Sequence, residues 1–212
     1  MDSISLRGLF NVNGFFYKKE DYTFRKLLNI IKKSSKSTTP DLMVIMMNPG
    51  SSHPEGTKGY KEIPEDLFDK MVPTVPDNTQ DQIMRLMLAC NFKYARIINL
   101  SDLCESKSNC FYSKLKDLNL YNISHSIFYD ERKLELEKLM ELKVKLIVAW
   151  GVNKSIKDLA EKAIGKIGLP KIGLNKENIE WAYYHPLPRS IQKKKEWVKE
   201  IENQILLSNF ND

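Results

Sequence analysis

Residues 42–50 read LMVIMMNPG, a nearly continuous apolar run that breaks into an Asn-Pro-Gly turn. A second segment, residues 179–188, reads IEWAYYHPLP and ends its apolar run in a His-Pro turn. Short apolar runs bounded by turn residues are typical of buried strands. Because ligands in open α/β sheets bind outside the carboxyl ends of parallel strands, we expect both turns to border one crevice.

Two more apolar runs, residues 95–100 and 144–150, complete a set of four predicted strands. Helical spacing alternates with them: apolar residues share one helical face over residues 24–31, 83–90, 156–163 and 191–205, and another helix is expected near 131–142. Alternating helices and strands favour parallel pairing with right-handed crossovers. The predicted fold is therefore α/β, a three-layer α/β/α sandwich around a central, mainly parallel sheet of about four strands.

The length of 212 residues predicts a single domain over residues 1–212, with a core at about residues 40–205 and an N-terminal extension packed on it. No apolar run approaches the ~20 residues of a membrane-spanning helix, and the N-terminus lacks a signal-peptide pattern. We therefore expect a cytoplasmic protein with no membrane partner, and a monomer.

The cysteines and histidines do not predict a metal or cofactor. Cys90, Cys104 and Cys110 form an odd set with no CxxC pair, so neither a disulfide framework nor four iron–sulfur ligands are expected. The three histidines are too far apart in the sequence to indicate a metal site. Free thiols are typical of a reducing compartment.

The charge balance favours a polyanionic partner. The chain has 33 basic and 27 acidic residues, a net charge of +6 and a pI of about 9.0. Arg189 and the run Lys193, Lys194 and Lys195 directly follow the second polar turn. We expect these cations to contact a phosphate backbone, although such a run is also typical of a solvated helix face.

Polar residues and glycines gather at the predicted strand ends. Asn48 and Asn99 each offer a donor and an acceptor, which suits the reading of an amide-like ring edge. A neutral His185 can donate a hydrogen bond to a developing oxyanion. Gly50 and Gly151 allow backbone N–H groups to approach a ligand closely. Each residue also has a purely structural explanation, as a turn former or as a partner for loop backbone.

The order of these motifs resembles that of the uracil-DNA glycosylase superfamily. MMNPG at residues 46–50 looks most like the motif of the mismatch-specific and thymine-DNA glycosylase branch. IINL at residues 97–100 resembles the strand whose Asn reads the uracil edge. HPLPRS at residues 185–190 resembles the segment that supplies a His to the pyrimidine carbonyl and a wedge into the duplex. The chain is also similar to an uncharacterised bacterial and phage family of that fold.

The resemblance implies a DNA glycosylase that excises a damaged or modified pyrimidine base by hydrolysis of the N-glycosidic bond, with no cofactor and no iron–sulfur cluster. It implies single- or double-stranded DNA as partner. The implied catalytic residues are Asn48 and His185. The residues expected to bind the substrate are Pro49, Gly50, Asn99, Gly151 and, as the stacking aromatic, Tyr60 (Phe68 is the other candidate). The residues expected to contact DNA are Leu187 as the wedge, Arg189, Lys193, Lys194 and Lys195.

Two departures from the superfamily pattern leave other functions open. Asn48 stands where the strongest uracil-excising branch has Asp, and Met46 replaces the leading Gly. A non-catalytic nucleic-acid or nucleotide-binding protein on the same fold is therefore an alternative. A small nucleotide or nucleoside hydrolase that uses the same crevice is another.

Overall fold

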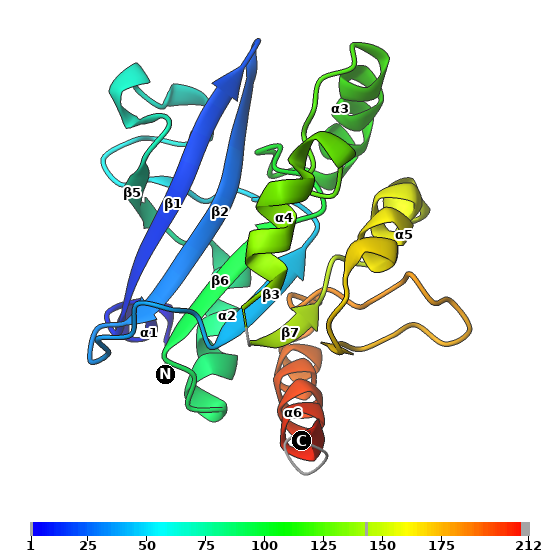
Figure 1. Cartoon of the computed structure of the whole chain (residues 1–212). Coiled ribbons are helices and arrows are strands. Elements are labelled where there is room, and N and C mark those ends of the chain that lie inside the picture. Colours follow the sequence, from blue (N-terminus) through cyan, green and yellow to red (C-terminus); the bar gives the residue numbers. More distant parts are fainter. Residues whose placement is uncertain (1, 143, 209–212) are drawn as a thin grey trace.

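The computed structural model describes residues 2–142 and 144–208, which form an eight-stranded mixed sheet with helices on both faces (Figure 1). The strand order is β4-β5-β1-β2-β6-β3-β7-β8. The strands are β1 Phe10–Lys19, β2 Tyr22–Lys32, β3 Leu42–Met46, β4 His53–Pro54, β5 Met71–Val75, β6 Tyr94–Asn99, β7 Lys145–Val148 and β8 Lys171–Ile172. The α-helices are α1 Ser3–Arg7, α2 Asn78–Ala89, α3 Ser108–Leu120, α4 Lys133–Met140, α5 Lys157–Lys166 and α6 Ile191–Ser208.

The sheet differs from the predicted one. Four of its seven strand pairs are antiparallel and three are parallel, so the expectation of a central, mainly parallel sheet of about four strands was wrong. Parallel pairing is confined to β6, β3, β7 and β8 at one end of the sheet. The antiparallel strands β2, β1, β5 and β4 extend the sheet from β6.

The first large difference lies at residues 10–32, where a long hairpin replaces the helix predicted over residues 24–31. Phe24 belongs to the core on one face of the sheet, while Leu28 and Ile30 belong to the core on the other. In a regular strand these residues would share one face, but the register shifts between the pairs Phe16–Arg25 and Phe15–Leu27, and this bulge places Phe24 opposite Leu28 and Ile30. Glu20, with φ of 51°, turns the chain between β1 and β2.

The second difference concerns residues 179–184, which are not a strand. The fourth parallel strand is β8, which pairs with β7. The 179–184 segment is a turn in which Ala182 N–H donates to the carbonyl of Ile179. Trp181 and Ala182 are buried in the core, so tertiary packing and not strand pairing explains their apolar character.

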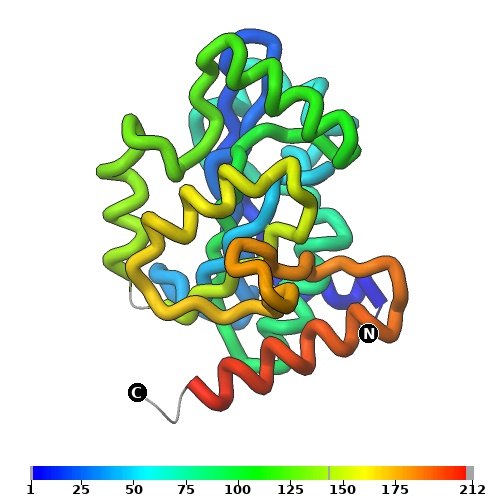
Figure 2. Tube along the Cα trace, turned by 90° about the vertical axis from the view of Figure 1, so that its right-hand side faces the viewer, coloured from blue at the N-terminus to red at the C-terminus, as the bar shows by residue number. Residues whose placement is uncertain are grey.

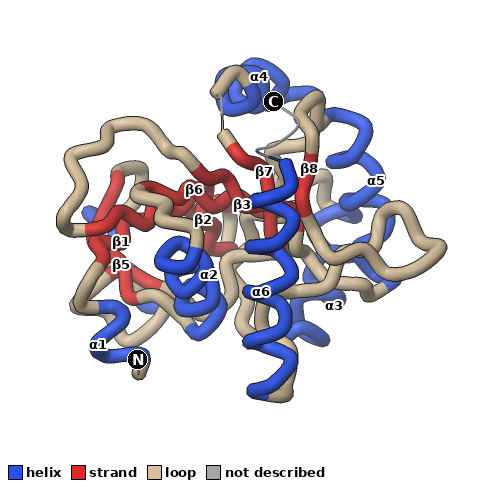
Figure 3. Tube along the Cα trace, turned by 90° about the horizontal axis from the view of Figure 1, so that it is seen from below, coloured by secondary structure: helices blue, strands red, loops and turns tan. Residues whose placement is uncertain are grey.

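Helices cover both faces of the sheet, and the chain connections change direction at β3. Helices α3, α4 and α5 contribute to the core on one face, and α1, α2 and α6 to the core on the other. Figure 3 shows α4 on one side of the strands and α2 and α6 on the other. The connection from β3 to β6 runs through α2 on one face, and the connection from β6 to β7 runs through α3 and α4 on the other. The winding therefore reverses at β3, which is where α/β sheets open a ligand crevice. None of the described helices is long and apolar enough to cross a bilayer.

Candidate functional site

An open pocket of about 340 Å³ lies at the carboxyl end of β3. It is lined by Asn48 and Gly50 from the turn after β3, and by His185 and Leu187 from the segment before α6. The two polar turns are more than 130 residues apart in the chain (185 − 48 = 137) and share this pocket. Asp77, which sequence analysis did not single out, lines it as well.

Asn48 is held in one orientation. Its Nδ2 donates to the backbone carbonyls of Glu105 at 2.6 Å and Leu103 at 3.4 Å. Because two carbonyl oxygens can face only the NH₂ side of an amide, the orientation of the carboxamide is determined. The side chain lines the pocket, so its Oδ1 is left as an acceptor for a ligand or water there.

The His185 ring is also held in one tautomer. Its Nδ1 accepts a hydrogen bond from Leu187 N–H at 3.2 Å, so the proton of the neutral ring lies on Nε2. Burial lowers the pKa of His185 to about 4, while the negative charge of Asp77 opposes that shift. The ring is therefore neutral at pH 7 and carries a donor, Nε2–H, at the pocket.

The irregular segment that carries His185 is fixed by two side chains and one backbone N–H group. Gln82 Nε2, in α2, donates to the carbonyl of Pro186 at 3.2 Å. Trp197 Nε1, in α6, donates to the carbonyl of Tyr184 at 3.3 Å. Gly151 N–H, after β7, donates to the carbonyl of Tyr183 at 2.8 Å. Gly151 does not line the pocket, and its N–H is already used, so it supports the His185 segment from behind.

Gly50 and Asp77 fit closely against each other. Gly50 has φ of +70°, and a Cβ placed on it would lie 2.5 Å from Asp77 Oδ2. Asp77 caps α2, with Oδ1 accepting from the N–H groups of Thr79 and Gln80, and Gln80 completes a capping box. The sequence signal that could have identified Asp77 is the pattern Asp-x-x-Gln before an apolar helix, DNTQ at residues 77–80.

A fully buried polar layer lies behind the turn. Asn99 is level with Met46 in the β3–β6 register, and neither polar atom of its side chain has a partner among the described residues. Arg25 Nη1 donates to Ser52 Oγ at 2.7 Å and to the carbonyl of Pro49 at 3.3 Å, while its Nε and Nη2 have no partner in the described part of the chain. Burial lowers the pKa of Arg25. Asn99 and Pro49 therefore lie beside the pocket and do not line it.

The candidate stacking aromatics lie outside this pocket. Tyr60 is buried and lines a neighbouring hollow of about 590 Å³, which shares Ser51, Asp77 and Ser106 with the pocket. Phe68 packs into the same small core cluster as Tyr60. Neither ring faces Asn48 and His185 across the pocket in this structure.

A larger hollow of about 820 Å³ continues from the pocket between α2 and α6, and shares Asn78 and Leu187 with it. In Figure 2, α1 (dark blue) lies beside the turn that leads into α6 (orange to red), and residues of both line this hollow. Its basic residues are Arg85, Lys194, Lys195 and Lys199, and its acidic residues are Asp81 and Glu202.

The hollow between α2 and α6 has an excess of positive charge. Arg7 pairs with Asp81 at 2.7 Å and neutralises it. Within residues 2–142 and 144–208, neither Lys194 nor Lys195 has a carboxylate oxygen within 4.0 Å. Lys193 and Arg189 are exposed close by in the chain and do not line the hollow.

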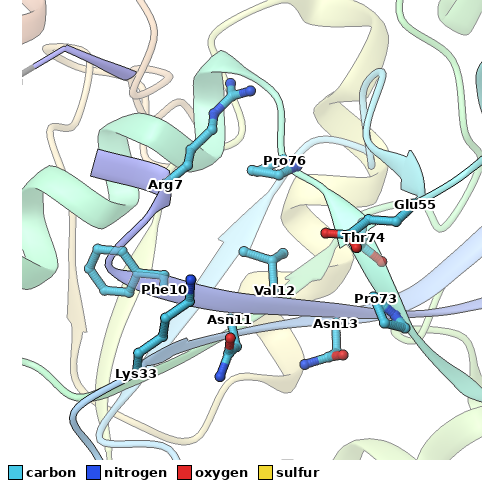
Figure 4. Close-up of a pocket in the computed structure, with 10 residues that line it drawn as sticks. All are labelled: Arg7, Phe10, Asn11, Val12, Asn13, Lys33, Glu55, Pro73, Thr74 and Pro76. Atoms are coloured by element: carbon cyan, nitrogen blue, oxygen red, sulfur yellow. The ribbon is translucent and has the colours of Figure 1, made fainter. Parts of the chain in front are cut away.

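A further hollow, of about 530 Å³, lies over β1 and β5 and contains none of the predicted site residues (Figure 4). Arg7, Lys33 and Glu55 lie around it with the proline and asparagine side chains of the two strands. Its charges are mixed and it shares no lining residue with the pocket at β3, so we do not assign the site to it.

The described residues contain no group of three or more His, Cys, Asp or Glu side chains that could hold a metal ion. Comparison with family models, curated proteins and solved structures found no match for this chain. The pocket and the sequence motifs are therefore the features that bear on function.

Proposed function

We propose that this chain is a DNA glycosylase-like hydrolase that excises a damaged or modified pyrimidine base. The observation that carries the proposal is the pairing of Asn48 and His185 in one pocket. One presents an oriented acceptor and the other an oriented neutral donor. The motif order, which resembles that of the uracil-DNA glycosylase superfamily, supplies the reaction class.

The chemistry needs these two groups. Breaking the N-glycosidic bond builds positive charge on the sugar and negative charge on the leaving base, and positioned dipoles stabilise both charges. In the proposed reaction, Asn48 Oδ1 holds the attacking water at the sugar. His185 Nε2–H donates to the base carbonyl oxygen as negative charge grows there.

Asn99 is the proposed reader of the Watson–Crick edge of the flipped base, since its amide has an unused donor and an unused acceptor. Met46 is level with Asn99 on the neighbouring strand and lines the pocket, whereas Asn99 does not. A methionine side chain is flexible, so it can move aside when a base enters.

The proposed DNA contacts lie on the α6 side of the pocket. Leu187 lines both the pocket and the hollow between α2 and α6, which suits an apolar wedge that replaces the flipped base. Lys194 and Lys195 would neutralise phosphates along that hollow, with Arg189 and Lys193 beside it, so binding should weaken steeply with salt. The three free cysteines support an intracellular, reducing location.

The test is abasic-site formation on a panel of uracil, mismatched and modified-base oligonucleotides. We expect the parent to cleave at least one substrate, and His185→Ala to slow the single-turnover rate by ~10²-fold or more, as for a lost oxyanion donor. His53→Asn is the control, because His53 lies outside the pocket, and it should leave the rate unchanged. A parent-like rate in His185→Ala would remove His185 from the mechanism.

The same panel separates the alternatives. Salt-dependent DNA binding without abasic product would identify a non-catalytic binding protein, which the carboxamide of Asn48 in place of a carboxylate favours. Tight binding of a free nucleotide with weak binding of DNA would indicate a nucleotide or nucleoside hydrolase.

A further inference from the structure

The reaction proposed above leaves one proton without an acceptor. When water attacks the sugar it must lose a proton, and a carboxamide such as Asn48 can accept a hydrogen bond but is not a base. The His185 ring is used as a donor toward the leaving base, and its Nδ1 is occupied by Leu187 N–H. Asp77 supplies the carboxylate that lines this pocket.

The two oxygens of Asp77 have different surroundings. Oδ1 caps α2 through the N–H groups of Thr79 at 2.8 Å and Gln80 at 3.4 Å. Oδ2 accepts one long hydrogen bond, from Ser51 N–H at 3.3 Å. A carboxylate oxygen can accept more than one hydrogen bond, so Oδ2 retains capacity for a water molecule.

Gly50 keeps Oδ2 uncovered on the side of the Asn-Pro-Gly turn. Any Cβ at this position would lie 2.5 Å from Oδ2 and force the carboxylate away. The turn that carries Asn48 thus contacts Asp77, the cap of α2, at Gly50, where the turn has no side chain. This contact brings Oδ2 to the turn that carries Asn48.

The negative charge of Asp77 is not neutralised by a direct partner. Among the described residues, no Lys, Arg or His nitrogen lies within 4.0 Å of its carboxylate. Asp77 is half-buried, and its field extends to His185 across the pocket and to Arg25 behind the turn. A carboxylate in an ion pair would stabilise a developing positive charge less, because its own charge would already be neutralised.

We propose that Asp77 is the catalytic carboxylate of this pocket, an inference that rests on the proposed glycosylase function. The water oxygen forms a bond to C1′ of the sugar and passes one proton to Asp77 Oδ2. The bond from C1′ to the base nitrogen breaks, and its electron pair leaves with the base. His185 Nε2–H stabilises the base anion, which then takes a proton from Asp77 or solvent. Before the transfer, the carboxylate also stabilises the positive charge on the sugar.

The decisive variant is Asp77→Asn, because asparagine caps helices as well as aspartate does but carries no charge and is not a base. We expect the single-turnover rate on the substrate that the parent cleaves to fall by ~10²-fold or more. The urea midpoint of unfolding should stay at the parent value. Affinity for the uncleaved oligonucleotide should stay equal or increase, since a negative charge near DNA is removed.

Two further variants keep the test decisive. Asp77→Ser retains a capping hydroxyl and should lose the same rate, so a folding defect in one variant does not hide the result. Asp2→Asn is the matched control, because Asp2 caps α1 through Ser5 N–H at 2.9 Å and lies outside the pocket. It should cleave at the parent rate.

The outcomes separate this inference from the function on which it rests. A parent rate in Asp77→Asn would overturn the inference alone, and the glycosylase proposal would stand. Loss of activity in proportion to loss of stability would overturn it too, and would identify Asp77 as a helix cap only. A parent that forms no abasic product on any substrate would overturn both.

Discussion

At the level of single residues, the most unusual feature is a buried polar layer with unused hydrogen-bonding groups. Four side-chain atoms, in Arg25 and Asn99, are buried and lack a partner among the described residues. Native proteins pair nearly all such groups, and each unpaired one costs about 1–3 kcal/mol. Their position behind the Asn-Pro-Gly turn fits groups that are satisfied only when a ligand is bound.

Replacing Asn99 with leucine should therefore separate stability from function. Leucine has a similar shape and no polar atoms, so Asn99→Leu should raise the free energy of unfolding by about 1 kcal/mol while it abolishes base discrimination. The control is Asn29→Leu, because Asn29 Oδ1 accepts a hydrogen bond from Arg96 Nε at 3.0 Å. Losing that hydrogen bond should lower the free energy of unfolding. Urea unfolding of both variants measures the change in the free energy of unfolding. Equal destabilisation would mean that the Asn99 amide is satisfied in the free protein.

The protonation of His185 gives a second test at this level. The pKa of about 4 lies below the usual 6.5, so the folded protein keeps the ring neutral while the unfolded chain takes up a proton below pH 6.5. His185 therefore lowers stability as pH falls from about 7 to 4. The ring signal in an NMR titration should have its midpoint near 4. In Asp77→Asn the midpoint should fall further, because Asp77 raises this pKa; a midpoint near 6.5 would contradict the assignment.

At the level of elements, the sequence predicted β3, β6 and β7 well because strands covered on both faces are nearly continuous in apolar residues. The β1–β2 hairpin was missed because apolar residues such as Phe24 and Leu28 also fit helical spacing. Residues 179–184 were misread because a turn that packs aromatic rings into the core has the composition of a strand. In both cases tertiary contacts, which one sequence does not reveal, decided the local structure.

Two glycine substitutions should have opposite effects. Gly50→Ala should destabilise the protein by about 1 kcal/mol or more and reduce activity, because φ is +70° and the new Cβ would displace Asp77. Gly165→Ala should stabilise it by about 0.5–1 kcal/mol, since Gly165 lies in α5 and a Cβ there meets nothing within 4 Å. Thermal unfolding measures both shifts. A stable, fully active Gly50→Ala variant would show that the close contact with Asp77 is not required.

At the level of the whole molecule, the site combines residues that sequence reasoning could find with residues that it could not. Asn48 and His185 were expected to meet because both follow apolar runs, and they do share a pocket. His185 does not follow a strand, however. Hydrogen bonds from side chains such as Gln82 fix the segment that carries it. Asp77 is positioned at the pocket as the N-cap of α2, and Arg25 lies behind the turn because it belongs to the antiparallel strand β2. Their convergence depends on the topology of the complete sheet.

The hairpin of residues 10–32 is an integral part of that sheet. β2 lies between β1 and β6 and carries Phe24, Leu28 and Ile30 into both cores. A chain that begins at residue 40 loses these side chains and exposes the edge of β6, so it should not fold cooperatively. Burying one Leu or Phe contributes about 1.5–3 kcal/mol, so losing the seven buried apolar side chains of residues 2–39 removes about 10–20 kcal/mol, as much as the usual stability of a domain.

Urea unfolding followed by circular dichroism compares this shortened chain with a full-length chain carrying Leu28→Ala. The single substitution should lower the free energy of unfolding by about 2–5 kcal/mol and keep a cooperative transition. The shortened chain should show no transition and should aggregate through the uncovered edge of β6. A cooperative transition in the shortened chain would mean that the parallel strands form an independent core. In that case Arg25, which holds the Asn-Pro-Gly turn from β2, would be dispensable for the pocket.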